Sequence, residues 1–398
     1  MRVLFLSAWY PYPADNGVRI RILNVLRQLA ADNHEITLLS FARRPLTGDA
    51  LAAVRCLCSD VRVVPYVAFQ PGRLRAVVGL FSAQPRSFID TYSPSMADLV
   101  RAECAAKRYD LIIASTIEMA PYALLAKGVP RILEEVELAT IREQALQGPF
   151  VRRARYGLTW YKTARFVRQL VERFDACTVV SPQEHRLLAG VAPEYRHIAV
   201  VPNGVDLEGY PANLGIPEPD TLIHSGALSY RPNYDAVDHF LREVFPLIRR
   251  QRPTVTVRIT GSTDGLDLRA LPDAPGTIFT GYLPDIRPAV AQSWVSVVPL
   301  RIGGGTRLKI LEAMALGTPV VSTPKGAEGL DVRHGEHLLI ADTPEAFAAA
   351  VLQVLADPSL RAQLAAGGRR LVEERYGWQR IGQGLRALVR KTAGEAAQ

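Results

Sequence analysis

The stretch of residues 297–330 constrains the fold of this chain more than any other segment, and it reads VVPLRIGGGTRLKILEAMALGTPVVSTPKGAEGL. Two short, apolar, β-branched runs, at 297–300 and 320–323, are typical of parallel strands covered on both faces. Between them, apolar residues recur at helical spacing from an expected N-cap at Thr306 to a stop at Gly317. The pattern predicts a strand, a glycine loop, a helix and a second strand of an α/β fold.

The glycine loop predicts a site for an anion. It consists of Gly303, Gly304 and Gly305. Glycines leave backbone N–H groups uncovered, and the start of the following helix favours a phosphate. Arg307 and Lys309 place two cations in the first helical turn, and Glu312 follows one turn later, where it can accept hydrogen bonds from a ribose diol. The alternative is an ordinary glycine turn followed by a solvated Lys/Glu face.

This segment resembles the donor-site signature of the retaining glycosyltransferases of family 4. The resemblance implies the GT-B architecture, with two facing Rossmann-like domains, parallel sheets and an active-site cleft between them. Most of that family carries two glutamates with seven residues between them; Glu312 fits the second, whereas Gly304 stands in place of the first. The form GGGTR-K-LEA is similar to a branch that includes capsule, exopolysaccharide and secondary-metabolite sugar transferases.

With 398 residues, the chain is longer than one hydrophobic core usually serves, so two domains are expected. The resemblance implies an acceptor domain over 1–206, ending in the NGVD motif, and a proline-containing linker over 207–220. A nucleotide-sugar donor domain would follow over 221–375, and a C-terminal helix over 376–398 would cross back to the first domain.

The net charge of +8 lies entirely in the N-terminal half. Residues 1–205 carry 26 Lys and Arg against 18 Asp and Glu, and residues 206–398 carry 21 of each. Many of these cations alternate with aromatic residues over 148–174, a pattern that would suit an anionic membrane surface or a nucleic acid. The alternative is a helix that packs its aromatic residues inward and leaves a solvated basic face.

No apolar run is long enough to span a membrane and no secretory pattern begins the chain, so we expect a cytoplasmic protein, with peripheral contact at the inner membrane face as a further expectation. The four cysteines are scattered through apolar sequence, which favours buried, reduced thiols. They are Cys56, Cys58, Cys104 and Cys177.

The first half of the chain predicts alternating strands and helices. A strand over 2–8 leads to a loop that contains Tyr10 and Asn16, and a helix opens at Gly17 with Arg19 and Arg21 near its start. This loop resembles the glycine loop that closes over the donor diphosphate in the family. We predict Tyr10, Asn16 and Arg19 as acceptor-side residues and Gly17 as a donor contact.

Polar residues also follow two later strands, predicted over 111–115 and 131–133. Ser115, Thr116 and Glu118 follow the first, and Glu134, Glu135 and Glu137 follow the second. Because ligands gather at the carboxyl ends of parallel strands, these acids could orient an acceptor hydroxyl. Surface acids or helix N-terminal charges would explain any one of them equally well.

The second half restarts the pattern with a strand over 221–225 and a loop that begins at Gly226. Relatives commonly carry an arginine and a lysine in this loop, but Ala227 and Pro232 stand there, with Arg231 adjacent. The resemblance therefore assigns the diphosphate to Arg307 and Lys309. It also implies that the nucleotide base lies near Leu283.

The resemblance, together with these features, implies a hexosyltransferase-type enzyme that moves a sugar from a nucleotide diphosphate to a hydroxyl acceptor with retention. We predict Arg307, Lys309 and Glu118 as catalytic residues, no cofactor, and no metal because the chain offers no D-x-D pair. A sugar-nucleotide epimerase of the same shape is the alternative. A nucleic-acid partner is not expected, because it would not explain the glycine loops and Glu312. The sequence does not identify the nucleotide base, the donor sugar or the acceptor.

Overall fold

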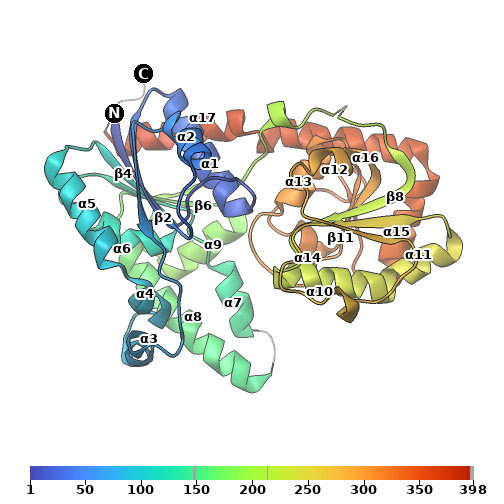
Figure 1. The fold of residues 1–398 in the computed structure, drawn as a ribbon, viewed down its shortest axis with the longest axis horizontal. Helices are drawn as coiled ribbons and strands as arrows, with labels where there is room; N and C mark the ends of the chain where they lie inside the picture. Colours follow the sequence, from blue (N-terminus) through green and yellow to red (C-terminus); the bar gives the residue numbers. More distant parts are fainter. Residues whose placement is uncertain (147–148, 213, 395–398) are drawn as a thin grey trace. The chain divides into compact units, whose positions relative to one another are not determined.

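The computed structural model describes residues 1–146, 149–212 and 214–394, and the chain forms two compact units (Figure 1). One unit comprises Met1–Pro202 together with the residues from Gly382 onward, and the other comprises Asn203–Ile381. Each unit is an α/β unit with its own parallel sheet and its own hydrophobic core.

The first unit contains a seven-stranded parallel sheet in the order β3-β2-β1-β4-β5-β6-β7. Its strands are β1 (Arg2–Ser7), β2 (Glu35–Ala42), β3 (Asp60–Pro65), β4 (Leu111–Ser115), β5 (Arg131–Glu134), β6 (Ala176–Val179) and β7 (Ile198–Val200). The strand order reverses at β1, which pairs with both β2 and β4. In such sheets ligands bind at the carboxyl ends of the strands near the reversal.

Helices connect these strands. They are α1 (Gly17–Ala31), α2 (Gly48–Arg55), α3 (Leu74–Val78), α4 (Arg86–Thr91), α5 (Pro94–Ala106), α6 (Ala120–Ala123), α7 (Ala139–Leu146), α8 (Phe150–Val171) and α9 (Pro182–Val191), with short 3₁₀ turns η1 (Gly79–Phe81) and η2 (Ile117–Met119). The core on one face joins Leu4 and Leu6 of β1 to Met96 of α5 and Val167 of α8, all without exposed surface. The near-continuous apolar sequence of β1 is explained by this burial.

The second unit contains a six-stranded parallel sheet in the order β10-β9-β8-β11-β12-β13. Its strands are β8 (Glu218–Ser225), β9 (Thr256–Thr260), β10 (Thr277–Gly281), β11 (Ser293–Val298), β12 (Val320–Ser322) and β13 (Leu339–Ile340). Strand β8 begins three residues earlier than the sequence predicts, within the segment expected to be linker. Residue 213 of that segment lies outside the described residues.

The helices of this unit are α10 (Arg231–His239), α11 (Phe245–Gln251), α12 (Arg287–Ala291), α13 (Leu308–Ala315), α14 (Pro324–Ala327), α15 (Pro344–Ala356) and α16 (Pro358–Leu371). Short turns complete it: the 3₁₀ turns η3 (Leu207–Gly209) and η5 (Leu268–Ala270), and the π-helical η4 (Phe240–Val244) and η6 (Val372–Tyr376). The last helix, α17 (Trp378–Thr392), contributes its part from Gly382 onward to the first unit, where Arg386 contacts Gln28 and Arg390 donates to Asp32. Residues 395–398 lie outside the described residues.

The segment 297–330 has the predicted order of strand, loop, helix and strand, but its first strand, β11, begins at Ser293 and ends at Val298, and its helix begins later than expected. Helix α13 starts at Leu308, the N-cap position belongs to Arg307, and no side chain caps it. Thr306 is therefore not the cap; its carbonyl instead accepts a hydrogen bond from the Leu308 N–H at 3.0 Å. Gly303 and Gly305 have φ of +104° and +79°, which only glycine adopts without strain.

Candidate functional site

Loops after three neighbouring strands meet at the carboxyl edge of the second sheet. The Gly226 N–H donates to the Thr260 carbonyl at 3.0 Å, and the Gly261 N–H donates to the Gly281 carbonyl at 2.9 Å. Leu283, which we predict near the nucleotide base, follows two residues after Gly281 and is half-buried. These contacts bring the loops after β8, β9 and β10 together at the edge where α/β sheets bind ligands.

The loop after β8 also contacts helix α13. A Cβ atom added at Gly226, whose φ is +134°, would lie 2.6 Å from Asn233 Nδ2 and 3.0 Å from Lys309 Nζ. Lys309 Nζ donates to Asn233 Oδ1 at 2.8 Å, and Asn233 Nδ2 donates to the Ala227 carbonyl at 2.9 Å. Asn233 thus fixes the Lys309 ammonium against the glycine of the β8 loop. A larger residue at position 226 would displace both side chains.

The environment of Lys309 disfavours its charge when no anion is bound. Burial and the neighbouring Arg307 guanidinium lower the pKa of Lys309 to about 7, and the carboxylate of Glu312 opposes this shift. His224 of β8 is buried and places Nδ1 3.0 Å from the Val297 carbonyl, so that nitrogen carries the hydrogen. Burial and the charge of Lys309 hold the pKa of His224 well below its usual range. A bound anion would supply the missing counter-charge to Lys309.

Glu312 is oriented by a residue far away in the sequence. The Tyr210 hydroxyl donates to Glu312 Oε1 at 2.9 Å. Burial raises the pKa of Glu312, while this hydrogen bond and the charge of Lys309 act in the opposite direction. Burial and Glu312 also raise the pKa of Tyr210, so its hydroxyl stays a donor. Lys309 and Glu312 lie one turn apart on α13 and interact electrostatically, as the sequence predicts for that helix face.

Arg307 does not extend freely from the glycine loop. Its guanidinium turns back and donates to the Gly304 carbonyl at 2.5 Å, the Gly303 carbonyl at 2.7 Å and the Lys325 carbonyl at 3.3 Å. Arg307 is 6% exposed. The glycine loop leaves these carbonyls without helical partners, and the planar guanidinium satisfies several of them at once. Arg307 therefore organises the loop, and Lys309 is the cation beside Gly226.

The remaining donor-side candidates lie around this loop. Gly303 packs against Pro232, to whose Cγ an added Cβ would come within 3.0 Å. Gly305 and Thr306 are half-buried, and Arg231 is exposed at the first position of α10. Asn233 and Tyr210 were not predicted from the sequence. The position of Asn233 in the first turn of a helix after a glycine loop was the available signal; Tyr210 offered none.

The first loop of the N-terminal unit is organised by its own residues. Tyr10 is buried, its hydroxyl donates to the Ala50 carbonyl at 2.8 Å, and burial raises its pKa to about 12. Tyr10 is thus a core residue rather than a side chain open to an acceptor. Asn16 caps α1 by accepting from the Arg19 N–H, and Arg19 pairs with Asp15 at 2.9 Å. Gly17 is exposed at the first position of α1.

Arg21 of α1 is a core residue. It has no exposed surface, donates from Nε to Glu134 Oε1 at 2.6 Å, and donates from Nη1 to the Val201 carbonyl at 3.0 Å. Ser115 donates to the other oxygen of Glu134 at 3.2 Å. Arg21 and Glu134 form a buried ion pair that ties α1 to β5, and Arg21 also binds the backbone directly after β7.

The acids after β4 and β5 share one electrostatic environment. Thr116 and Glu135 adopt φ of +73° and +60°, a backbone region that costs energy for a β-branched residue such as Thr116. The pKa of Glu135 is raised to about 8, first by burial and then by Glu134, Glu137 and Glu118, while Arg21 opposes the shift. Glu118 is exposed, and Glu137 accepts from the Thr140 hydroxyl at 2.6 Å. The acids that the sequence places after these two strands therefore interact in the structure, and Glu135 senses the charges of the other three.

Helix α8 carries the basic and aromatic segment, whose first residue, 148, lies outside the described residues. The C-terminal half of α8 packs inward through Thr163, Val167 and Leu170. Its first residues do not: Phe150 is 84% exposed and Val151 is 80% exposed. Trp160 and Phe166 pack against the core, whereas Phe150 and Tyr161 are exposed, so the alternative of inward-packed aromatic residues holds for only some of them.

Three further expectations concern metal, thiols and membrane spans. Within residues 1–146, 149–212 and 214–394, no group of three or more His, Cys, Asp or Glu is arranged to hold a metal ion. All four cysteines are free; Cys58 and Cys177 are buried, whereas Cys56 is exposed, so the prediction of a buried thiol is wrong there. In the described part of the chain, no helix combines the length and apolar character needed to cross a bilayer.

Comparison with known proteins connects both units to sugar transfer. A glycosyl transferase 4-like domain matches residues 16–204, and the domain of group 1 glycosyl transferases matches residues 219–357. A GDP-mannose-dependent α-(1-6)-phosphatidylinositol monomannoside mannosyltransferase from Mycolicibacterium smegmatis is 24% identical, over 76% of this chain and 90% of that protein.

Two solved structures share the fold over nearly the whole chain. A sucrose-phosphate synthase from Thermosynechococcus elongatus has a TM-score of 0.72 at 18% identity and covers 100% of both chains. Anabaena HepE in complex with UDP and glucose has a TM-score of 0.70 at 16% identity, over 98% of this chain and 100% of that one. With both units matched by glycosyltransferase domains and the fold matched throughout, the chain belongs to the family 4 type of glycosyltransferases and has their GT-B fold.

Proposed function

We propose that this glycosyltransferase transfers a sugar from a nucleotide diphosphate to a hydroxyl acceptor with retention at the anomeric carbon. The observation that carries the proposal is the arrangement of Lys309, Asn233 and Gly226 at the carboxyl edge of the second sheet. This arrangement holds the Lys309 amine next to Gly226, whose backbone no side chain covers, and such a site suits a diphosphate. HepE, a structural neighbour, was solved with UDP and glucose, which supports a nucleotide-sugar donor here.

In this proposal, the donor is held at two points. Lys309 and the N–H groups of the glycine loop bind the diphosphate, and Glu312, oriented by Tyr210, accepts hydrogen bonds from the ribose hydroxyls. Arg307 keeps the loop in shape and adds positive potential. Because negative charge accumulates on the diphosphate as the glycosidic bond breaks, these groups would stabilise the transition state without a metal ion.

The bond changes balance without a protein nucleophile. The bond between the anomeric carbon and the diphosphate oxygen breaks, and the acceptor oxygen bonds to that carbon from the same face. The acceptor proton passes to a diphosphate oxygen, and the nucleoside diphosphate leaves. We propose Glu118 and Glu137, with Thr116, as the residues of the first unit that orient the acceptor.

Binding and hydrolysis assays test the donor site. We expect UDP or GDP to bind in a calorimetric titration, and the matching nucleotide sugar to be hydrolysed slowly without acceptor. Lys309→Ala should lower kcat on the order of 10²-fold, comparable to the loss of one preorganised oxyanion donor. Lys127→Ala, at an exposed lysine of the first unit, is the matched control. Unchanged kcat in Lys309→Ala would reject this site.

We further propose that the enzyme contacts an anionic membrane peripherally through the N-terminal half of α8. Phe150 and Val151 expose apolar surface there, and Arg152, Arg153 and Arg155 lie on the same two turns. Each exposed cation near an anionic surface adds about 1 kcal/mol. The name of the mycobacterial relative specifies a phosphatidylinositol-based acceptor, which supports a lipid-linked acceptor for this chain.

Liposome flotation tests this contact. At low salt, we expect the parent enzyme to float with phosphatidylglycerol vesicles and not with phosphatidylcholine vesicles. Replacing Arg152, Arg153 and Arg155 by Gln should abolish flotation, whereas the same replacement of Arg250, Arg269 and Arg333 in the second unit should not. If the parent enzyme stays at the bottom of the gradient with anionic vesicles, a water-soluble acceptor is the better account.

A further inference from the structure

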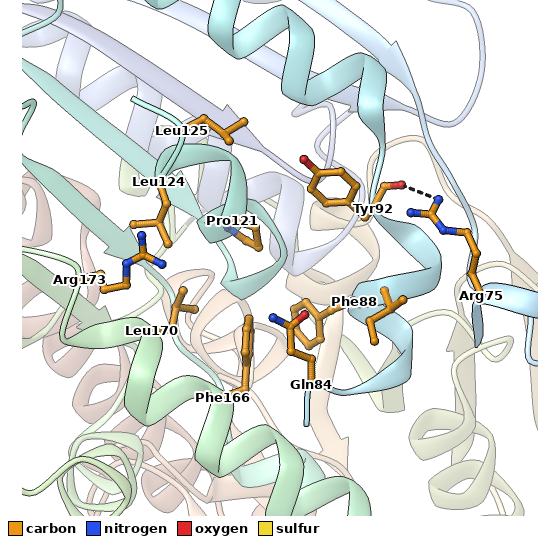
Figure 2. Close-up of a pocket in the computed structure, with 11 residues that line it drawn as sticks. Arg75, Gln84, Phe88, Tyr92, Pro121, Leu124, Leu125, Phe166, Leu170 and Arg173 are labelled. Carbon is orange, nitrogen blue, oxygen red and sulfur yellow. Dashed lines mark hydrogen bonds between the residues drawn. The ribbon is translucent and has the colours of Figure 1, made fainter. Parts of the chain in front are cut away.

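The first unit contains a pocket that none of the proposed donor and acceptor residues line. Its volume is about 490 Å³, within the range of about 300–1,000 Å³ that is typical of small-molecule pockets. It is lined by side chains from α3, α4, α6, α8 and their connections: Arg75, Gln84, Phe88, Ile89, Tyr92, Pro121, Leu124, Leu125, Phe166, Leu170 and Arg173 (Figure 2).

The lining of this pocket is mainly apolar, with cations at its sides. The rings of Phe88 and Phe166 lie 5.1 Å apart, and Leu124 and Leu170 line the wall nearby. Figure 2 shows Arg75 and Arg173 on opposite sides of the pocket. Arg75 donates to the Tyr92 carbonyl at 3.3 Å, and Arg173 is exposed. Such a pocket suits a molecule with a hydrocarbon body and an anionic end.

The pocket adjoins an exposed apolar turn, η1, which lies beside α8. Lys162 of α8 donates to the Leu80 carbonyl of η1 at 2.6 Å, so these two elements lie side by side. Phe81, the last residue of η1, is 91% exposed, and Gln84, three residues later, lines the pocket. The pocket therefore lies near the exposed Phe81 and the cation of Lys162, and apolar side chains next to cations are typical of a lipid-facing surface.

We propose that this pocket binds the hydrocarbon chain of a lipid phosphate, with the exposed Arg173 toward the phosphate, and that this lipid carries the acceptor. The inference rests on the proposed transfer to a lipid-linked hydroxyl. A free sugar is a poorer occupant, because the Phe88, Phe166, Leu124 and Leu170 side chains would leave its hydroxyl groups without hydrogen-bond partners. A buried chain gains about fourfold in affinity per methylene.

Calorimetric titration of the full-length enzyme with monomeric alkyl phosphates tests the pocket. We expect dodecyl phosphate, below its micelle concentration, to bind at least 10²-fold more tightly than butyl phosphate, and inorganic phosphate to bind more weakly than both. Leu124→Trp, which fills the pocket, should weaken dodecyl phosphate at least tenfold. Leu158→Trp, on an exposed part of α8, should leave the affinity unchanged.

Further variants test the phosphate contact and the filling of the pocket separately. Arg173→Gln should weaken dodecyl phosphate severalfold, and Arg168→Gln, an exposed neighbour on α8, should not. Ile89→Trp replaces Leu124→Trp if the latter fails to keep the thermal unfolding midpoint of the parent. Equal affinity for butyl and dodecyl phosphate, or parent-like binding by the Trp variant, would overturn the proposal. A lipid-free dimer that Leu124→Trp disrupts would also overturn it, since a second copy would then occupy the pocket.

This readout does not depend on sugar transfer. If dodecyl phosphate binds as expected and no nucleotide sugar is hydrolysed, the proposed function fails and the pocket assignment stands. If nucleotide sugars are hydrolysed and the alkyl phosphates show no chain-length dependence, only the pocket assignment fails.

Discussion

The protonation of Lys309 should make nucleotide affinity at the proposed donor site depend on pH. Its pKa of about 7 means that the ligand-free enzyme loses this positive charge as the pH rises above neutrality. A diphosphate binds the protonated form more tightly, so nucleotide affinity should fall between pH 7.5 and 9, by up to tenfold per pH unit. Titration of UDP or GDP in buffers of different ionisation heat should show uptake of up to one proton per nucleotide at the upper pH.

The control for this prediction keeps the charge at all pH values. Lys309→Arg carries a guanidinium that stays protonated, so the fall in affinity above pH 7.5 should disappear in this variant. A parent enzyme whose nucleotide affinity is constant from pH 7.5 to 9 would show that Lys309 does not bind the phosphates.

Glu312 tests the ribose contact. Glu312→Gln keeps the size of the side chain but loses the charge, so nucleotide binding should weaken by about 1.5–3 kcal/mol, the range of a charge-assisted hydrogen bond. Tyr210→Phe should have a smaller effect, because it removes only the group that orients Glu312. Equal affinity of Glu312→Gln and the parent, measured by calorimetry, would reject the contact.

Arg307 should affect stability as well as binding. Arg307→Ala leaves the carbonyls of Gly303, Gly304 and Lys325 without this donor, and we expect a loss of about 1–3 kcal/mol in the free energy of unfolding. Arg307→Lys should restore little, since an ammonium cannot reproduce the planar set of donors. The control is Arg301→Ala, at an exposed position nearby. Weaker nucleotide binding at parental stability would indicate direct contact with the ligand instead.

At the residue scale, the sequence predicted what local spacing determines. The glycine loop, Lys309 and Glu312 lie within one short segment, so their proximity follows from the helical repeat. The hydrogen-bond partners of these side chains could not be predicted in this way. The bond from Lys309 to Asn233 joins residues 76 positions apart, and the bond from Tyr210 to Glu312 joins residues 102 positions apart. The inward turn of Arg307 depends on the path of the loop backbone, which spacing alone does not define.

At the element scale, the buried pair of Arg21 and Glu134 joins α1 to the sheet. Arg21→Met would leave the Glu134 carboxylate buried without its counter-charge, which we expect to cost about 3–5 kcal/mol in urea unfolding. Arg19→Met, which breaks a partly exposed pair, should cost no more than about 1 kcal/mol. The double variant Arg21→Met with Glu134→Leu should recover much of the loss. Equal effects of the Arg21 and Arg19 variants would contradict this role.

The apolar runs of β1 and β4 predicted the strands well, because parallel strands buried on both faces need almost continuous apolar sequence. The strand predicted over 297–300 was placed too late, since β11 spans Ser293–Val298. Element ends were less predictable. Helix α13 starts one residue late, because its N-cap position belongs to Arg307 instead of Thr306, and β8 starts early because pairing with β11 extends it to Glu218. The exposed half of α8 could not be told from a packed helix, since its aromatic residues fit both.

At the scale of the whole molecule, the two sheets divide the chemistry between two halves of the chain. The second unit carries 18 Lys and Arg against 20 Asp and Glu, and its candidate donor-site charges lie around one loop. The first unit carries the excess cations and the apolar pocket. This division agrees with a donor unit that binds a nucleotide through a few fixed groups and an acceptor unit suited to an anionic, lipid-bearing molecule.

The most direct test of the account follows a nucleotide sugar by ³¹P and ¹H NMR in the presence of the enzyme. We predict release of the nucleoside diphosphate together with a sugar whose first-formed anomer has the configuration of the donor, at a rate about 10²-fold lower in Lys309→Ala. An inverted anomer would contradict retention. An epimerised sugar nucleotide with no diphosphate released would contradict the central claim of sugar transfer.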